Sequence, residues 1–209
     1  ISVTGVQTCA LPILLIGTGL LWFGWFGFNA GSAGAANALS VSAFATTNTA
    51  AAAAGLSWMF YDVMKGKKPS VLGFCIGAVV GLVAITPASG FVAIPQSIFI
   101  GAAAAIISNV ASHYLKSKST LDDTLDVFPC HGLGGMVGML LTGVFATKSV
   151  NAAGNDGLLY AYVSFPVTGN VNRRELQALQ KGIAIYSAHH PEEGGIGNGL
   201  YARWVGAPI

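Results

Sequence analysis

The chain has 209 residues, of which 53% are hydrophobic, 9% are charged and 28 are glycine, and its formal net charge is +2. Because soluble domains carry about 25% charged residues, this composition indicates a membrane protein. The small net charge and the lack of basic patches interleaved with aromatic residues argue against nucleic-acid binding. The three cysteines show no paired spacing, so they indicate neither a disulfide framework nor a zinc motif.

The two ends of the chain differ in character from its middle. Residues 1–10 lack the basic start and the long apolar core of a signal peptide, and we expect them to be a non-native segment outside the fold. Residues 161–209 are rich in glycine and charge, and we expect a divergent polar tail, disordered or frameshifted. The transmembrane unit is predicted at 11–160.

Apolar stretches recur between these ends. A helix of about 20 apolar residues crosses a bilayer core of about 30 Å. Five stretches are predicted to do so, at 11–31, 41–63, 70–85, 95–115 and 127–147. The sequence therefore predicts an all-α membrane protein with about five transmembrane helices. In the third stretch Gly73, Gly77 and Gly81 recur at every fourth position, which predicts a face for close helix packing.

Lysines indicate the orientation of these helices. They cluster at 65–68, after the second stretch, and at 116–118, after the fourth. Because cytoplasmic loops are enriched in Lys and Arg, both clusters are predicted to be cytoplasmic, and five spans in series place them on the same side. The lysine-free connections at 33–40 and 86–94 are predicted to face outward.

The first apolar stretch ends in the run LWFGWFGFNAGSA at 21–33, which combines aromatic residues, glycines and two small polar residues without any charge. In a membrane helix, polar groups face protein or a cavity. Asn29 and Ser32, beside Phe28, therefore predict a narrow and selectively polar passage. Phe28 and Ser32 are four residues apart and share a helix face. A purely structural interpretation is also open, with Phe28 in packing and the Ser32 hydroxyl bonded to its own helix.

The fifth stretch contains His131, the one ionisable residue well inside a predicted span. Such a residue is a candidate functional group, because a neutral imidazole both donates and accepts hydrogen bonds and changes charge near neutral pH. The structural alternative is a histidine bonded to a backbone carbonyl. Asp126, five residues earlier, is expected to cap the N-terminus of this helix.

The run at 21–33, together with DVFPCHGLGG at 126–135, resembles signature segments of the ammonium transporter and Rhesus protein family. The resemblance covers about 11–160. It implies the sixth to tenth membrane helices of that fold, which form the second of its two inverted five-helix repeats. An inverted repeat of this kind pairs with the other repeat to enclose a pore.

The resemblance also implies roles for single residues. His131 resembles one of two pore histidines in a proton relay, and Phe28 resembles the aromatic residue that gates the outer pore. Ser32 resembles the hydroxyl that recruits ammonium, and Thr86, in a Thr-Pro-Ala turn, resembles a residue near the outer pore. Asp126 resembles a structural aspartate of the same motif.

For the complete protein, the resemblance implies ammonium or ammonia as substrate, a multi-pass location in the cell membrane, a homotrimer and a cytoplasmic regulatory protein. We expect no cofactor and no metal, since His189 and His190 are adjacent and no second ligand cluster accompanies them. An intramembrane hydrolase with His131 as general base is the alternative, and it requires a nucleophile and a carboxylate beside the imidazole. We expect the fragment alone to be inactive.

Overall fold

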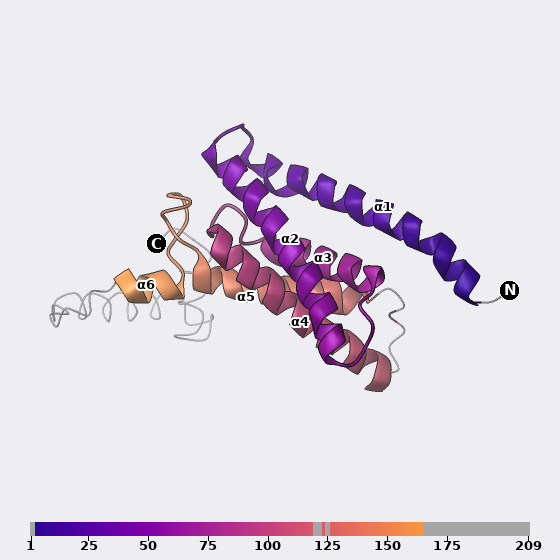
Figure 1. Ribbon diagram of the computed structural model, residues 1–209. Coiled ribbons are helices and arrows are strands. Elements are labelled where there is room, and N and C mark those ends of the chain that lie inside the picture. Colours follow the sequence, from indigo (N-terminus) through magenta and orange to yellow (C-terminus); the bar gives the residue numbers. More distant parts are fainter. Residues whose placement is uncertain (1–2, 119–122, 124–125, 165–209) are drawn as a thin grey trace, which may run out of the picture.

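The computed structural model describes residues 3–118, 123 and 126–164. The described residues form helices and their connections, with no strand among them (Figure 1). The α-helices are α1 (Val3–Asn29), α2 (Ala38–Met64), α3 (Val71–Ile85), α4 (Ile94–Lys118), α5 (Gly134–Phe145) and α6 (Leu158–Ser164). A 3-10 turn, η1 (Gly31–Ala33), follows α1, and a π-helical segment, η2 (Phe128–Leu133), precedes α5. The predicted all-α fold is confirmed.

The helix α1 lies along one side of the other helices, and its N-terminal end extends away from them (Figure 1). It begins at Val3 and contains Pro12, so it extends into the segment 3–10 that the sequence analysis set outside the fold. Only 6% of its apolar window is buried, against 39% for α4. From residue 11 onward, most of α1 is therefore uncovered by the described part of the chain.

The core lies where α2 packs against α3 and α4, and small residues bring these helices close together. Ala50 and Ala54 of α2 have no exposed surface. A Cβ atom on Gly81 would lie 2.5 Å from the Ala50 carbonyl oxygen, and one on Gly77 would lie 2.7 Å from that of Ala54. The glycine-rich packing face predicted for α3 is thus confirmed, and Gly101 of α4 meets the backbone of Ala50 in the same way.

The two lysine clusters lie at one end of the molecule, here called the lysine end. Lys67, just after α2, contacts the His113 imidazole of α4 through its ammonium group. Lys116, near the end of α4, lies with its Nζ 2.5 Å from Asp126 Oδ2, just before η2. These contacts agree with the prediction that both clusters share a side.

The connections at the other end, here called the opposite end, also meet one another. The Thr147 backbone N–H, just after α5, donates to the Phe91 carbonyl oxygen over 2.8 Å. Gly90 lies against Leu39 at the start of α2, where Asn37 and Ser40 form a reciprocal capping box. The helices α1 to α5 therefore alternate in direction between the two ends.

Among the described residues, three helices are long and apolar enough to cross a membrane, at Leu11–Ala33, Ile94–Lys118 and Phe128–Phe145. Five such helices were predicted from the sequence. The helix α3 is apolar but has 15 residues, which at about 1.5 Å per residue is shorter than a bilayer core. The helix α2 has 27 residues, many of them Ala, Ser and Thr. A helix of that composition suits burial among protein neighbours better than contact with lipid.

Candidate functional site

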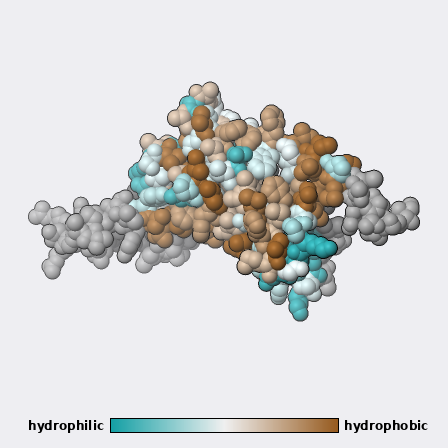
Figure 2. Space-filling view, viewed as in Figure 1, coloured by the Kyte–Doolittle hydropathy of each residue, from teal (hydrophilic) through white to brown (hydrophobic). Residues whose placement is uncertain are grey.

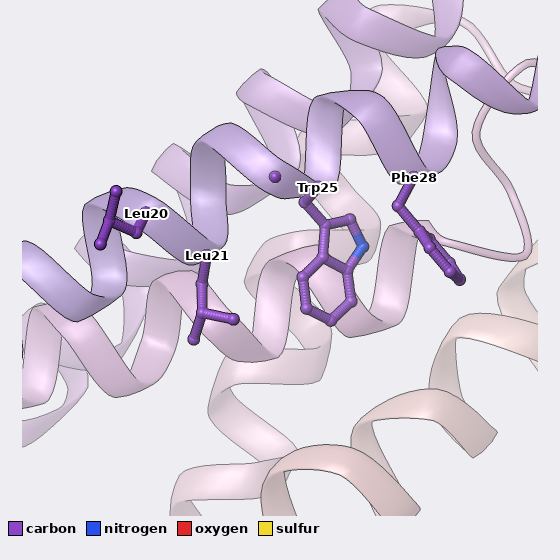
Figure 3. A pocket seen from close by; sticks show the side chains of 5 residues that line it. Leu20, Leu21, Trp25 and Phe28 are labelled. Atoms are coloured by element: carbon purple, nitrogen blue, oxygen red, sulfur yellow. The ribbon is translucent and has the colours of Figure 1, made fainter.

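Aromatic side chains at the C-terminal end of α1 line a hollow of about 430 Å³. Leu21, Trp25 and Phe28 project from the same side of the helix (Figure 3), as their spacing of four and three residues requires. Leu20 and Gly24 complete the lining. The rings of Trp25 and Phe28 lie 5.9 Å apart between centroids and are tilted by 59°. Phe28, the predicted gate, is 62% exposed.

Thr86 fixes the position of Trp25. The Trp25 indole N–H donates to Thr86 Oγ1 over 2.8 Å, and this hydroxyl donates in turn to the Leu82 carbonyl oxygen over 2.7 Å. Thr86 is the C-terminal cap of α3, so the bond ties α1 to α3. Thr86 was predicted from its Thr-Pro-Ala turn, and Trp25 stands in the aromatic run at 21–33. Their pairing was missed, because no sequence signal links residues so far apart.

Ser32 lies in η1, one turn beyond Phe28, and is exposed. Its hydroxyl donates to the Phe28 carbonyl oxygen. This bond is the one expected if Ser32 bonds to its own helix. It leaves the lone pairs of the hydroxyl oxygen able to accept a hydrogen bond. Ser32 and Phe28 therefore remain together at the opposite end.

Asn29 does not line a passage, contrary to the sequence-based prediction. Its side chain is buried, and its Nδ2 donates to Thr47 Oγ1 of α2 over 3.0 Å. An unpaired amide inside an apolar bundle is costly, so Asn29 and Thr47 satisfy each other between the two helices. Asn29 thereby fixes the packing of α1 on α2.

His131 is exposed, while the preceding Pro129 and Cys130 are buried. It lies in η2, where the Gly134 N–H is bonded to the carbonyl oxygens of both His131 and Pro129. In an unbroken α-helix His131 would share a face with Gly138, which packs on the backbone of α3. A π-helical turn holds extra residues, which changes the face on which His131 lies. The π-helical segment was missed from the sequence, although Pro129, which lacks an N–H, is consistent with irregular helix geometry.

The carboxylate that caps this helix is that of Asp123, which corrects the prediction for Asp126. Asp123 accepts hydrogen bonds from the backbone N–H groups of Val127 and Phe128, each over 2.8 Å. Asp126 instead accepts from the Ser112 hydroxyl over 2.7 Å and pairs with Lys116. Its side chain is buried and its φ is 54°. Asp126 thus ties the start of η2 to α4, which is still a structural role.

The structure groups Phe28, Ser32, Trp25 and Thr86 at the opposite end, while His131 lies nearer the lysine end. His131 is the fourth residue of the apolar span Phe128–Phe145, which contains no other Asp, Glu, Lys, Arg or His. In the described part of the chain, no cluster of three or more His, Cys, Asp or Glu could hold a metal. His189 and His190 lie outside the described residues.

The Ammonium Transporter Family matches residues 3–186 of the chain. This range includes residues 3–10 and 161–186, which the sequence analysis placed outside the transmembrane unit. An ammonium transporter of Bacillus subtilis (strain 168) is 49% identical over 149 residues, which are 71% of this chain and 37% of that protein. One of Aquifex aeolicus (strain VF5) is 50% identical over 149 residues, 71% of this chain and 35% of that protein.

Solved structures agree with these matches. The crystal structure of Candida albicans Mep2 matches with a TM-score of 0.64 and 46% identity, over 68% of this chain and 32% of that one. A structure titled Sensor Amt Protein matches with a TM-score of 0.64 and 34% identity, over 67% and 35%. These relatives carry the names of transporters, not of enzymes. The chain spans about a third of the length of these relatives, is a multi-pass membrane protein and belongs to the Ammonium Transporter Family.

Proposed function

We propose that this chain supplies one wall of a pore that conducts ammonium as ammonia and a proton. The observation that carries the proposal is the exposed imidazole of His131 inside an otherwise uncharged span. Transfer of an ammonium ion into an apolar environment is very costly, and that of neutral ammonia far less so. A path through apolar helices therefore needs a group that exchanges a proton, and imidazole does so near neutral pH.

The aromatic hollow at the opposite end is proposed as the place where ammonium is recruited and gated. The face of an aromatic ring attracts a cation, and a hydroxyl oxygen accepts a hydrogen bond from an ammonium N–H. Phe28 and Ser32 provide these two groups one helical turn apart. Thr86 contributes through its bond to Trp25, which holds the indole beside Phe28.

The second wall of the pore is proposed to come from the other inverted repeat of a complete transporter. The largely unburied surface of α1 and the exposed position of His131 support this proposal, because both present surfaces that the described helices leave uncovered. By the same family relationship we propose a homotrimer and a cytoplasmic regulatory partner for the complete protein. The 209-residue chain alone is proposed to be inactive.

The lysine end is proposed to face the cytoplasm, because basic residues are retained on that side. A membrane-impermeant maleimide added outside cells tests this orientation in a variant without Cys9. A cysteine at Ala152, exposed at the opposite end, should react, and a cysteine at Lys68 should not. Reaction at Lys68 alone would reverse the orientation. The native Cys75 and Cys130 are buried and serve as unreactive background.

A chimera tests the proposed function. Residues 11–160 replace the matching segment of the Bacillus subtilis ammonium transporter, and the product is expressed in cells that lack their own ammonium transporters. We expect uptake of labelled methylammonium that ammonium inhibits. The unmodified relative and a version without the segment are the controls. A chimera present in the membrane at the level of the relative, with uptake no higher than the deleted version, would contradict the proposal.

A further inference from the structure

A second groove lies at the lysine end, lined by residues of α2, the loop after it and α4, and its lining includes none of the residues of the proposed pore. Its volume is about 420 Å³. Hydrophilic and hydrophobic surfaces meet at this end of the molecule (Figure 2). The groove combines basic, hydroxyl and apolar side chains: Tyr61, Lys65, Lys67, Val110, His113 and Ser117.

The groove carries a positive charge that its own carboxylate does not balance. Asp62, which is buried behind it, lies 3.5 Å from Lys67 Nζ and 3.6 Å from His113 Nε2. One carboxylate is thus shared between Lys67 and His113. The Lys65 ammonium group instead lies 5.4 Å from the centroid of the Tyr61 ring. A cation placed over a ring face keeps its N–H groups free to bind an anion.

The wall of the groove changes from polar to apolar toward the middle of the α4 span. Ser117, His113, Val110 and Ile106 recur at intervals of three and four residues, so they follow one face of α4. Val110 is 46% exposed and Ile106 is 40% exposed. The face therefore offers hydrogen-bond donors at the membrane boundary and apolar surface one and two turns deeper.

We propose that this groove binds the phosphate headgroup of an anionic phospholipid, with an acyl chain along Val110 and Ile106. A dissolved phosphate ion would bind the cations but leave the apolar wall exposed, and an acidic protein segment would also leave it exposed. A phospholipid in the leaflet at the lysine end can bind the cations through its phosphate and cover the apolar wall with an acyl chain. Anionic lipids attract basic residues beside a membrane span.

The test measures the affinity of the complete 209-residue chain in a mild detergent for phosphatidylglycerol, phosphatidylcholine with the same acyl chains, and inorganic phosphate. We expect phosphatidylglycerol to bind most tightly. Lys65→Gln leaves the Asp62–Lys67 pair intact and should weaken its binding about five-fold, which corresponds to about 1 kcal/mol at 1.4 kcal/mol per ten-fold. Lys68→Gln, in the same loop but outside the groove lining, and Lys148→Gln, at the opposite end, are matched controls expected to bind as the unmodified chain does.

A second variant keeps the proposal testable if the first one misfolds. Circular dichroism and size-exclusion chromatography check the folding of each variant. Ser117→Asp adds a negative charge at an exposed position of the groove, so it should also weaken phosphatidylglycerol binding. Equal losses in all lysine variants would indicate diffuse surface charge and overturn the proposal. Equal affinity for the two lipids, displacement of the lipid by millimolar inorganic phosphate, or tighter binding of a glutamate-rich peptide would also overturn it.

Discussion

His131 differs from polar side chains of the helices that are bonded to a neighbouring helix. Asn29 is bonded to Thr47 over 3.0 Å, and Thr49 lies 2.5 Å from Ser97 through their hydroxyl oxygens. Buried polar groups that find partners in this way need no ligand to explain them. An exposed imidazole in an apolar span does need an explanation, and a polar path along that face provides one.

Asp126 is a structural residue in which two contributions can be separated: its backbone conformation and hydrogen bond to Ser112, and its ion pair with Lys116. Its φ of 54° is tolerated by Asp and Asn far better than by Ala. Asp126→Asn keeps an oxygen that accepts from the Ser112 hydroxyl, and it loses the charge that faces Lys116, whose side chain is 55% exposed.

We therefore predict that Asp126→Asn lowers the free energy of unfolding of the chimera by at most about 1 kcal/mol, while Asp126→Ala lowers it by about 1–3 kcal/mol. Thermal unfolding in detergent, followed by circular dichroism, compares the two variants. Equal midpoints for Asn and Ala would show that the bond to Ser112 and the backbone conformation contribute little.

The packing of α3 on α2 depends on the absence of a side chain at Gly81. A Cβ atom there would lie 2.5 Å from the Ala50 carbonyl oxygen and 2.8 Å from the Ala51 Cα, and backbone atoms cannot rotate away. Gly134 of α5 is also buried, but its Cβ atom would lie 3.5 Å from Val80 Cγ1, which is an ordinary contact.

Gly81→Ala is predicted to destabilise the bundle by about 1–3 kcal/mol, because the helices must separate. Gly134→Ala is predicted to be neutral or stabilising by up to about 1 kcal/mol, because alanine favours a helix. Unfolding midpoints of both variants in the chimera test this pair. A larger loss for Gly134→Ala than for Gly81→Ala would contradict the described packing.

The positions of the helices could be predicted from the sequence because apolar runs and lysine clusters are local signals. The spacing of Gly73, Gly77 and Gly81 also revealed a packing face before the structure was known. The bond between Trp25 and Thr86 could not be predicted, because it depends on how α1 lies on α3. The exposed position of His131 follows from the π-helical segment, whose hydrogen bonds no apolar period reveals.

The capping residue was misassigned for a similar reason. Asp123 and Asp126 are both carboxylates just before the same helix, and either could be its cap by spacing alone. The structure distinguishes them through Ser112 and Lys116, which lie on α4 and attract Asp126 away from the helix start. The role of a carboxylate that can interact with two elements cannot be predicted from the sequence of one element alone.

At the scale of the whole molecule, the described helices form a bundle whose apolar surface is partly uncovered. The core of α2, α3 and α4 is closely packed, and His131 is exposed. The helix α1 lies along one side of the other helices (Figure 1), and most of its apolar surface from residue 11 onward is uncovered. The chain spans about a third of the length of its relatives, and the proposed pore takes its second wall from another part of the complete transporter.

The most direct test of this account is the entry of ammonium into liposomes that contain the purified chimera, measured as the positive charge carried inward after a pulse of ammonium. We predict a saturable inward current above that of protein-free liposomes. His131→Ala should slow ammonium entry by at least about ten-fold, since a positioned acid or base contributes that much or more to a proton-transfer step. Equal amounts of the two proteins are reconstituted for this comparison. An unchanged rate in the His131→Ala liposomes would contradict the central claim that His131 faces the conducted ammonia.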